Sequence, residues 1–398
     1  MKTTQIIDIG YLVASSSKST MSTFKERSND AIKIGVRLCL IGMTQENLEA
    51  IREGKNIQVR VWKNNSFLEE ISIPVPMVIY DRTPVGNSSS KTDLFIEALI
   101  HAGCKFLNSP EVRMMARDKW AQYKFFATRG VKIPYTAKYT EAELSSFLKK
   151  GLVFIKPRSG SEGKNQIIIK RVEGESKTAS VYKITNTFGK KTEVLVSGIK
   201  EVKKYLSDFP LSSQTYIIQE GVKIDCIEEE VRGQKRQRSF DFRVIVQRTA
   251  NGNPVVTIAF VRVGPPRSDQ ANISQGGHPQ DIESVFENHQ DVIETLKIEA
   301  IGIFNLLAES YTVSEMAFDF VKDTEDDFSL WFLEENSRPG TKGPRTLREW
   351  VPTDKMYARK GIILYDEVYS NKRRQKWGAR FLAFRVLPFY YGRTLVNS

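Results

Sequence analysis

Apolar and polar positions change their spacing along the first hundred residues. Apolar runs at Val36–Gly42, Ile57–Trp62 and Met77–Tyr80 are typical of strands, and helical spacing begins at Gln45 and near Thr92. A chain that alternates strands with helices forms a small α/β domain with a largely parallel sheet. We therefore predict such a domain in the N-terminal part.

The middle of the chain contains many strand-like runs. Helical spacing over Arg113–Arg129 precedes them, and two shorter helices are expected over Glu141–Lys150 and Gly198–Asp208. The strand-like runs are Leu152–Ile155, Gln166–Ile169, Ser180–Asn186, Thr192–Ser197, Thr215–Val222, Phe240–Gln247 and Val255–Val263. A helix from about Asp281 to Ala308 follows. These runs predict a second, sheet-rich part of the chain.

The stretch Glu315–Gly340 has the pattern of a β-hairpin. Period-two runs at Met316–Val321 and Phe328–Leu333 flank the polar turn Asp323–Asp327. Its carboxylates are difficult to explain as ordinary surface, so we take this hairpin as the candidate centre of a site.

Three polar side chains of the hairpin fall on half-apolar faces. Because side chains alternate along a strand, Glu334 and Asn336 should share a face with Phe332, and Asp319 should share one with Val321. Two acids and an amide that converge offer the hard oxygen ligands that Mg²⁺ takes when it also holds phosphates. The alternative is a solvated acidic face.

Charged residues also follow a strand in the N-terminal part. Asp81 and Arg82 come directly after Met77–Tyr80, at the carboxyl end of a strand, where ligands collect in open α/β sheets. They are candidates for substrate contact. The alternative is a turn-forming aspartate beside a solvated arginine.

A lysine and a flexible loop follow another strand. Lys156 comes directly after the buried run Leu152–Ile155. The loop after it contains Ser159, Gly160, Ser161 and Gly163. A point positive charge and free backbone N–H groups together suit a polyphosphate. A hairpin with a solvated lysine is the alternative.

Composition narrows the class of protein. The 398-residue chain is 40% apolar and 27% charged, which is ordinary for a globular protein of two or three domains. Its three cysteines and three histidines are scattered, which argues against a disulfide framework, a histidine-rich zinc site and a Ser/His/Asp enzyme. Without a signal-peptide pattern or a transmembrane segment, we predict a cytoplasmic protein.

The C-terminal part is strongly basic. From Lys342 to Ser398 there are 13 Lys and Arg against four Asp and Glu, which accounts for most of the net charge of +12. The charges and the aromatic run FLAFRVLPFYY fit a nucleic acid, an anionic membrane surface, an acidic peptide or carrier protein, or a helix folded onto the core. Nucleic acid is not favoured, because the aromatic residues follow the charges instead of alternating with them. The apolar run should bury itself on the core of the protein or across a homodimer.

In this order the motifs resemble the ATP-grasp superfamily of ligases, and most closely its endospore coat-associated YheC/YheD family. The strand ending in Tyr-Asp-Arg, VPMVIYDR, resembles that family's N-terminal pattern, and the likeness covers about Ile34–Gly343. It implies an α/β (α+β) ATP-grasp fold with a small Rossmann-like pre-ATP-grasp domain. The implied divisions are 1–110 for that domain, 111–225 for a linker helix and lid, 226–345 for the catalytic core and 346–398 for a basic extension.

The resemblance implies a nucleotide site. Lys119 of the Asp-Lys pair and Lys156 resemble the two lysines that hold the ATP phosphates, and Arg158–Lys164 resembles the loop that closes over them. The implied adenine and ribose positions are Gln219, Glu220, Val222 and either Asp225 or Glu228.

The same resemblance implies catalytic, metal and substrate positions. Arg243 and Arg262 resemble the arginines that bind phosphate and the acyl-phosphate intermediate, together with Lys156. The implied ligands of Mg²⁺, expected as two ions, are Asp319, Glu334 and Asn336. The implied substrate residues are Asp81, Arg82, Asn272, Gly276, Gly277, Arg338 and Gly340. Arginines among them predict a substrate carboxylate besides the reacting one.

These residues predict an ATP-dependent ligase that joins a carboxylate to the amine of an amino acid or peptide and releases ADP and phosphate. Two lysines, two arginines and bound Mg²⁺ would neutralise the triphosphate and the charge that develops during transfer. Alternatives are the loading of an amino acid on a carrier-protein thiol or amine, and a coat-associated protein that binds ATP without catalysis. The basic loop Arg232–Arg238 and the basic tail depart from the family pattern, so the substrate stays open.

Overall fold

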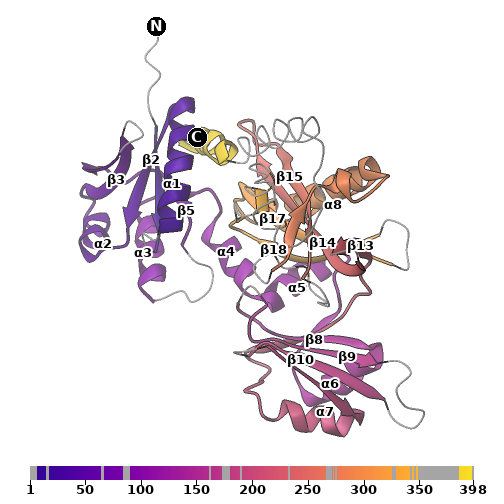
Figure 1. Cartoon of the computed structure of the whole chain (residues 1–398). Helices are drawn as coiled ribbons and strands as arrows, with labels where there is room; N and C mark the ends of the chain where they lie inside the picture. Colours follow the sequence, from indigo (N-terminus) through magenta and orange to yellow (C-terminus); the bar gives the residue numbers. More distant parts are fainter. Residues whose placement is uncertain are drawn as a thin grey trace.

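The computed structural model arranges the chain in three lobes, each built on one β-sheet (Figure 1). The structure describes residues 7–14, 18–63, 67–83, 90–160, 163–172, 180–188, 191–231, 234–265, 271, 273, 276–324, 329–340, 343–344, 347 and 385–396. Within these ranges no helix has the length and apolar character needed to cross a membrane.

The N-terminal lobe has the strand order β4-β3-β2-β1-β5-β6. Its strands are β1 (Ile7–Val13), β2 (Val36–Gly42), β3 (Ile57–Lys63), β4 (Phe67–Ile73), β5 (Val78–Asp81) and β6 (Lys105–Phe106), and its helices are α1 (Lys18–Ala31), α2 (Gln45–Arg52) and α3 (Ser90–His101). The strands β2, β1, β5 and β6 are parallel, as predicted, and β3 and β4 form an antiparallel edge. The sequence patterns miss β1, which is buried at the centre of the sheet, and the polar edge strand β4.

The lid lobe has the strand order β11-β10-β9-β8-β12-β7. Its strands are β7 (Thr136–Lys138), β8 (Leu152–Pro157), β9 (Ile167–Val172), β10 (Val181–Asn186), β11 (Thr192–Ser197) and β12 (Tyr216–Glu220). The helices α6 (Glu141–Phe147) and α7 (Gly198–Leu206) cover the face that points away from the other lobes (Figure 1). Because side chains alternate, Lys156 and Gln219 lie on the uncovered face.

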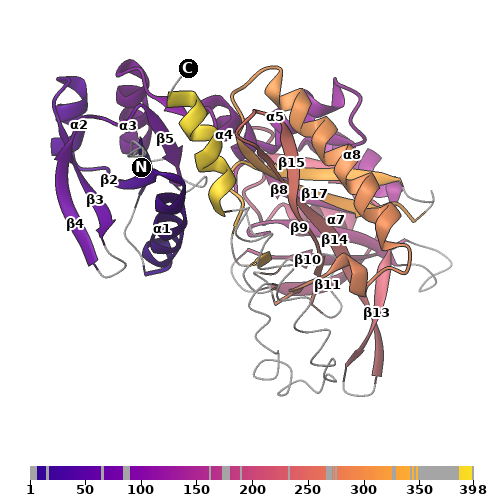
Figure 2. The same cartoon turned by 90° about the horizontal axis from the view of Figure 1, so that it is seen from above.

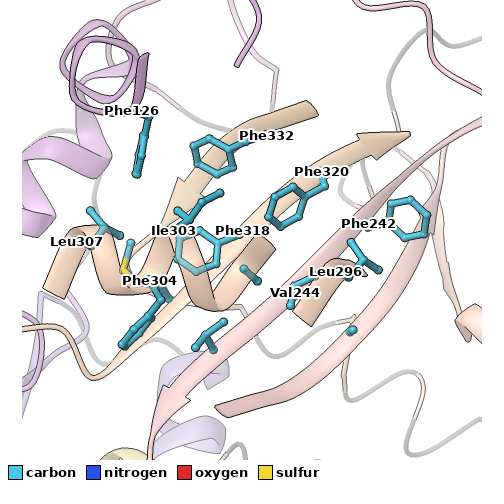
Figure 3. Close-up of a cluster of buried hydrophobic side chains, with 14 of the residues drawn as sticks. Phe126, Phe242, Val244, Leu296, Ile303, Phe304, Leu307, Phe318, Phe320 and Phe332 are labelled. Carbon is cyan, nitrogen blue, oxygen red and sulfur yellow. The ribbon is translucent and has the colours of Figure 1, made fainter. Parts of the chain in front are cut away.

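The core lobe has the strand order β16-β15-β14-β17-β18, with β13 paired to β14. Its strands are β13 (Cys226–Val231), β14 (Gln234–Arg248), β15 (Pro254–Val263), β16 (His278–Gln280), β17 (Glu315–Lys322) and β18 (Leu330–Asn336). The helix α8 (His289–Ala308) covers one face, and Figure 3 shows its Leu296, Ile303 and Phe304 among aromatic side chains of the sheet. We call the opposite face of this sheet the inner face.

Two helices connect the lobes where a single helix is predicted. The segment over Arg113–Arg129 is divided into α4 (Pro110–Arg117) and α5 (Lys119–Ala127). Asp118 separates them, because its side chain accepts a hydrogen bond from the backbone N–H of Trp120 and caps α5. The start of α5 therefore places Lys119 at a helix N-terminus.

A β-bulge in the hairpin of β17 and β18 corrects the predicted faces. Asp319 pairs with Glu334, but Phe320 pairs with Phe332, so Leu333 is an extra residue in β18. Phe332 therefore packs with Phe320 in the core under α8 (Figure 3), whereas Glu334 lies on the inner face with Asp319. The prediction that Glu334 and Phe332 share a face is wrong, because strict alternation does not hold through a bulge.

Residues 234–238 of the predicted basic loop Arg232–Arg238 lie in the strand β14, and its first two residues lie outside the described residues. Two positive side chains of this strand pair with glutamates on β13: Lys235 with Glu228 at 2.7 Å, and Arg238 with Glu229 at 2.8 Å. The charges of Lys235 and Arg238 are thus compensated by β13. One further boundary differs, since α8 begins at His289 and not near Asp281. Part of the predicted turn Asp323–Asp327 lies outside the described residues.

The C-terminal helix, residues 385–396, packs on the N-terminal lobe, next to the core lobe in both views (Figures 1 and 2). Phe389 is completely buried among the side chains of β1, β5 and α1, on the face of the sheet opposite α2 and α3. Thr394 reaches the core lobe and donates from Oγ1 to the carbonyl of Ala250 at 2.9 Å. The described part of the aromatic run, residues 385–391, packs through Phe389 on the N-terminal sheet, and not on the core lobe as predicted.

We expect the substitution Gly221→Ala to destabilise the connection between lid and core. A Cβ atom at Gly221 would lie 2.1 Å from Cγ of Leu152, so the strand β8 or the connection itself must move, at a cost of about 1–3 kcal/mol. Gly302→Ala is the matched control, because a Cβ there meets nothing within 4 Å and the helix α8 should gain about 0.5–1 kcal/mol. Urea unfolding of both variants measures the difference, and equal midpoints would contradict the expected clash.

Candidate functional site

Two aspartates and two arginines form a buried ion-pair network on the inner face of the core sheet. Arg243 donates from Nε and Nη2 to the two carboxylate oxygens of Asp319 at 2.7 and 2.6 Å. Arg262 makes the same pair of bonds to Asp241, each 2.6 Å long, and its Nη2 also donates to Asp319 at 2.8 Å. The register produces this network, since each arginine lies directly opposite an aspartate on the neighbouring strand.

The ion-pair network can still bind both a cation and an anion. Burial disfavours the charged form of Asp319, but Arg243 and Arg262 outweigh it and lower the pKa of this carboxyl below its usual value. Asp319 accepts three hydrogen bonds, and a carboxylate has about four acceptor sites. Each guanidinium has five donors, and within the described part of the chain Nη1 of each has no partner. Asp319 can thus bind a cation and the arginines an anion.

Glu334 and Asn336 extend the inner face along β18. Glu334 lies opposite Asp319, and Asn336 lies opposite Ala317. Glu334 has no hydrogen-bond partner among the described residues, and Nδ2 of Asn336 is buried without one. In the described ranges no three His, Cys, Asp or Glu side chains come together. A cation here would therefore take two carboxylates and an amide, with phosphate oxygens to complete its shell, a donor set that fits Mg²⁺.

Two lysines supply positive charge near Glu334. Nζ of Lys156 donates to Oε1 of Gln219 at 2.8 Å, and Nζ of Lys119 donates to the carbonyl of Gly160 at 2.7 Å. Burial lowers the pKa of Lys156 to about 8 even though Glu334 acts to raise it. Burial also lowers the pKa of Lys119. Both ammonium groups thus lack sufficient counter-charge, which a triphosphate would supply.

The loop after Lys156 is tied to the lid at its far end. Oγ1 of Thr187 donates to the carbonyl of Gly163 at 2.8 Å and accepts from the backbone N–H of Gln166 at 3.0 Å. Ser159 and Gly160 belong to the described residues, whereas Ser161 lies outside them. The loop is therefore anchored beside the lysines, where the sequence predicts phosphate contacts.

Gln166 is a residue that the sequence reasoning missed. The pairing of Ile155 with Ile167 places the next residues, Lys156 and Gln166, side by side on the uncovered face of the lid. Gln166 is buried, and its Nε2 has no hydrogen-bond partner. Its position beside the lysine, one residue before a strand, is the signal that could have identified it.

The connection from lid to core offers a backbone donor. Glu220 accepts from the backbone N–H of Tyr135 at 2.7 Å and pairs with Lys150, so its carboxylate is committed to the lid. The backbone N–H of Val222 has no partner among the described residues. Of the predicted adenine contacts, the backbone at Val222 is the one that remains open.

The structure does not choose between the two predicted ribose acids. Asp225 pairs with Lys322 at 3.2 Å, and Glu228 pairs with Lys235. Both border a cavity of about 330 Å³ that Phe240 also lines, and Phe240 packs on the α8 side of the core sheet. Their role stays a prediction.

The predicted substrate residues lie in two groups. Asp81, Arg82 and Arg338 meet where β5 of the N-terminal lobe faces the loop after β18. Gly340 lies in that loop and is exposed. Gly276 and Gly277 precede β16 in a separate loop, and Asn272 lies outside the described residues.

A second network, which the sequence reasoning missed, joins the N-terminal lobe to the core. Glu315 is completely buried and accepts hydrogen bonds from Tyr80 Oη at 2.5 Å, Gln247 Nε2 at 3.0 Å and Arg82 Nη1 at 3.3 Å. Asn108 donates from Nδ2 to the carbonyls of Glu315 and Ser337, at 2.8 and 2.7 Å. A polar residue at the start of the apolar strand β17 was the available signal.

Comparison with known proteins identifies the family and the fold of the chain. The YheC/D-like ATP-grasp family matches residues 106–359. The endospore coat-associated protein YheD of Bacillus subtilis (strain 168) is 25% identical over 361 residues, which are 83% of this chain and 72% of that protein. An ADP complex of purK, an N5-carboxyaminoimidazole ribonucleotide synthetase, has a TM-score of 0.50 and 12% identity over 87% of this chain and 75% of its own. D-alanyl-alanine synthetase A from Vibrio cholerae O1 biovar eltor str. N16961 has a TM-score of 0.49 and 14% identity over 95% and 99%.

The family match covers well over half of the chain, and it includes the lid, the core sheet and the buried ion-pair network. The predicted fold, an α/β ATP-grasp fold with a small N-terminal domain, is confirmed. The chain belongs to the YheC/D-like ATP-grasp family.

Proposed function

We propose that this protein is an ATP-dependent ligase that joins a carboxylate to an amine and releases ADP and phosphate. One observation carries the proposal: the inner face of the core and the uncovered face of the lid present unsatisfied positive charge and metal-type ligands. These are Lys119, Lys156, Arg243, Arg262, Asp319, Glu334 and Asn336. A triphosphate and a cation are the ligands that satisfy both kinds of group.

These residues have different roles in the reaction. Lys119 and Lys156 hold the phosphates, while Nη1 of Arg243 and Arg262 faces the charge that develops as the γ-phosphoryl group moves. Asp319, Glu334 and Asn336 would hold Mg²⁺, which neutralises phosphate charge when bound. A substrate carboxylate oxygen attacks the γ-phosphorus, and the bond from phosphorus to the ADP oxygen breaks.

The second step consumes the acyl phosphate. The neutral amine nitrogen attacks the acyl carbon and the bond to the phosphate oxygen breaks. The proton that the nitrogen then loses leaves with the departing phosphate. The amine belongs to an amino acid or peptide in this proposal, and a carrier-protein amine or thiol is the variant of the same chemistry. No protein nucleophile is needed for either step.

A screen for ADP release tests the proposal. The full chain is incubated with ATP, Mg²⁺ and a panel of amino acids and short peptides, and ADP and AMP are separated by chromatography. We expect ADP release that requires an acceptor and that Asn336→Ala abolishes. Release of AMP in place of ADP would overturn the acyl-phosphate mechanism.

A second candidate follows from the coat-associated relative: a protein that binds ATP in a spore or surface layer without turnover. It predicts tight ATP binding with no product from any acceptor, together with recovery in an insoluble coat fraction. A protein of this kind has no need for the complete arrangement of Arg262, Asp319 and Asn336, so we favour the ligase. Fractionation of cells also tests the predicted cytoplasmic location.

ATP affinity should fall as the pH rises above about 8. The free protein loses the Lys156 proton as the pH passes the lowered pKa of about 8, and the bound phosphates favour the protonated lysine. Binding is thus strongest below pH 8 and weakens by up to about tenfold per pH unit above it. Titration calorimetry from pH 7 to alkaline pH measures the slope. Lys156→Arg stays charged and should show a flat profile, so equal slopes in both proteins would contradict the assignment.

A further inference from the structure

Two stretches of chain connect the lid lobe to the core lobe, and both contact the same turn of the core. The first stretch leaves α5 and enters the lid at β7, and the second leaves β12 and enters the core at β13. The turn lies between β17 and β18, the two strands that carry the proposed metal ligands. This hairpin therefore holds the points at which the lid is attached.

Lys132 fixes the first connection to the turn. Its Nζ donates to Oδ2 of Asp323 at 3.0 Å and lies 4.7 Å from the ring centroid of Trp331. Its carbonyl accepts from the backbone N–H of Phe332 at 2.8 Å. The next residue, Ile133, packs against the hydrophobic cluster under α8. The first connection is thus held by the core as far as Ile133.

The same turn fixes the second connection. Asp323 forms an antiparallel β-bridge with Ile224. Beside it, Oγ1 of Thr324 donates to the carbonyl of Lys223 at 3.4 Å. The second connection is thus held by the core from Lys223 onward.

On the lid side, both connections are held by strands of the lid sheet. The backbone N–H of Glu220 donates to the carbonyl of Tyr135 at 3.0 Å, and the backbone N–H of Gly221 donates to a carbonyl of β8 at 2.8 Å. Pro134 and Val222 therefore lie between the residues that are held by the lid and those that are held by the core.

Asp323 contacts both connections, the first through its carboxylate and the second through its backbone. Its Oδ2 also accepts from Nε1 of Trp331 at 2.8 Å, and its backbone N–H donates to the carbonyl of Ser329 at 2.9 Å, which closes the turn. The Asp323 side chain is only 14% exposed, so solvent screens its pair with Lys132 less than it screens a surface pair. One residue therefore determines where both connections leave the core.

We propose that Asp323 is a positioning residue that sets the angle between the lid and the core. The lid carries Lys156, and the core carries Arg243 and Arg262, so one triphosphate can contact both sets of charges only over a narrow range of lid angles. This consequence for ATP rests on the proposed function, whereas the contacts of Asp323 with the two connections do not.

The position of Asp323 on the hairpin gives the lid angle a reference point. Asp323 directly follows β17, four residues after Asp319, which is about 13 Å along a strand. The strand β17 is paired with β14 on one side and with β18 on the other, so the part between these residues is held on both edges. The lid is thus oriented relative to the proposed metal ligands themselves.

Distances between two spin labels test the proposal without any need for turnover. The labels are attached at Leu195→Cys in the lid and Ile298→Cys in the core, where the native side chains are 59% and 63% exposed. Cys104→Ser and Cys226→Ser remove the cysteines that are not buried. We expect a narrow distance distribution in the otherwise unaltered full chain and a wider one with Asp323→Ala. Equal widths overturn the proposal.

A milder variant keeps the test decisive if Asp323→Ala does not fold. Asp323→Asn retains one oxygen that can accept from Trp331 and loses the charge that pairs with Lys132, so it should widen the distribution less. Circular dichroism establishes that each variant is folded. Glu294→Ala is the matched control, because it also removes the carboxylate of a lysine pair, on the exposed surface of α8, and should not change the width.

Titration calorimetry with Mg²⁺ and a non-hydrolysable ATP analogue measures the consequence for the nucleotide. If the lid of Asp323→Ala occupies the binding angle about a tenth of the time, the apparent Kd rises about tenfold. Saturating analogue should then narrow the label distances again, which a residue that only stabilises the fold would not bring about. A wider distribution with an unchanged Kd overturns the link between lid angle and ATP binding.

The outcomes separate this proposal from the ligase. If the unaltered chain does not bind the analogue, the ATP-dependent function fails, and the label distances measured without nucleotide still decide the role of Asp323. If the analogue binds but the distances are the same in all variants, the positioning role is wrong and the ligase proposal stands.

Discussion

Truncation of the chain after residue 384 should expose one face of the N-terminal sheet and destabilise the N-terminal lobe. Phe389 is completely buried and packs edge-on against Tyr80, with ring centroids 5.4 Å apart. Gly392 lies so close to the sheet that a Cβ atom there would be 2.8 Å from Cδ1 of Ile9. Arg385 pairs with Asp30 at 2.6 Å. The C-terminal helix is therefore a layer of this lobe and not an appendage.

The single substitution Phe389→Ala should reproduce most of this effect. Removal of a fully buried phenylalanine costs about 3–5 kcal/mol of unfolding free energy, because the cavity collapses only in part. Ile298→Ala is the control, since Ile298 is 63% exposed on α8 and its loss should change stability by less than about 0.5 kcal/mol. Urea unfolding followed by circular dichroism measures both. Similar losses in the two variants would mean that the helix does not pack as described.

The substitution Phe389→Ala should also disturb the hydrogen-bond network around Glu315, which joins the N-terminal lobe to the core. Tyr80 contacts Phe389 with its ring and donates from its hydroxyl to Glu315, which also accepts from Arg82.

Because part of the basic tail belongs to the fold, truncation cannot isolate the predicted attraction of acidic partners by this tail. Neutralising substitutions of its lysines and arginines, assayed at low and high salt, are the appropriate test.

Asp319→Ala and Glu334→Gln should both abolish activity that depends on Mg²⁺, but only the first should destabilise the protein. Loss of Asp319 removes three hydrogen bonds from Arg243 and Arg262 and leaves buried positive charge unpaired, which costs about 3–5 kcal/mol. Glu334 has no hydrogen-bond partner among the described residues, so its change to glutamine should cost less than about 1 kcal/mol.

Thermal unfolding and ADP release, measured on the same preparations, separate these effects. Loss of a metal ligand removes several kcal/mol of charge stabilisation, so we expect Glu334→Gln to lower turnover about 100-fold or more with little change in Tm. Asp241→Ala is the matched structural control, because it removes two of the three hydrogen bonds of Arg262 without removing a proposed metal ligand. Full activity in Glu334→Gln would exclude Glu334 from the metal site.

The sequence by itself determined the class of fold and the order of the candidate residues. Runs of period two, the Gly-rich loop after Lys156 and the acidic hairpin are local patterns, and local patterns survive without knowledge of the tertiary contacts. They were sufficient to place the chain in its family. Strands with weak patterns, such as β1 and β4, were missed, since their position in the sheet depends on partners that are distant in sequence.

Only the tertiary structure decided which charged residues act together. The β-bulge at Leu333 puts Glu334 on the inner face, and cross-strand register pairs Arg243 and Arg262 with aspartates. Arg82 and Arg338 look equivalent in the sequence, but Arg82 donates to Glu315 and to the carbonyl of Pro339, whereas Nη1 of Arg338 is buried without a partner. Register and long-range hydrogen bonds follow from how the lobes meet, and no local spacing of residues encodes that meeting.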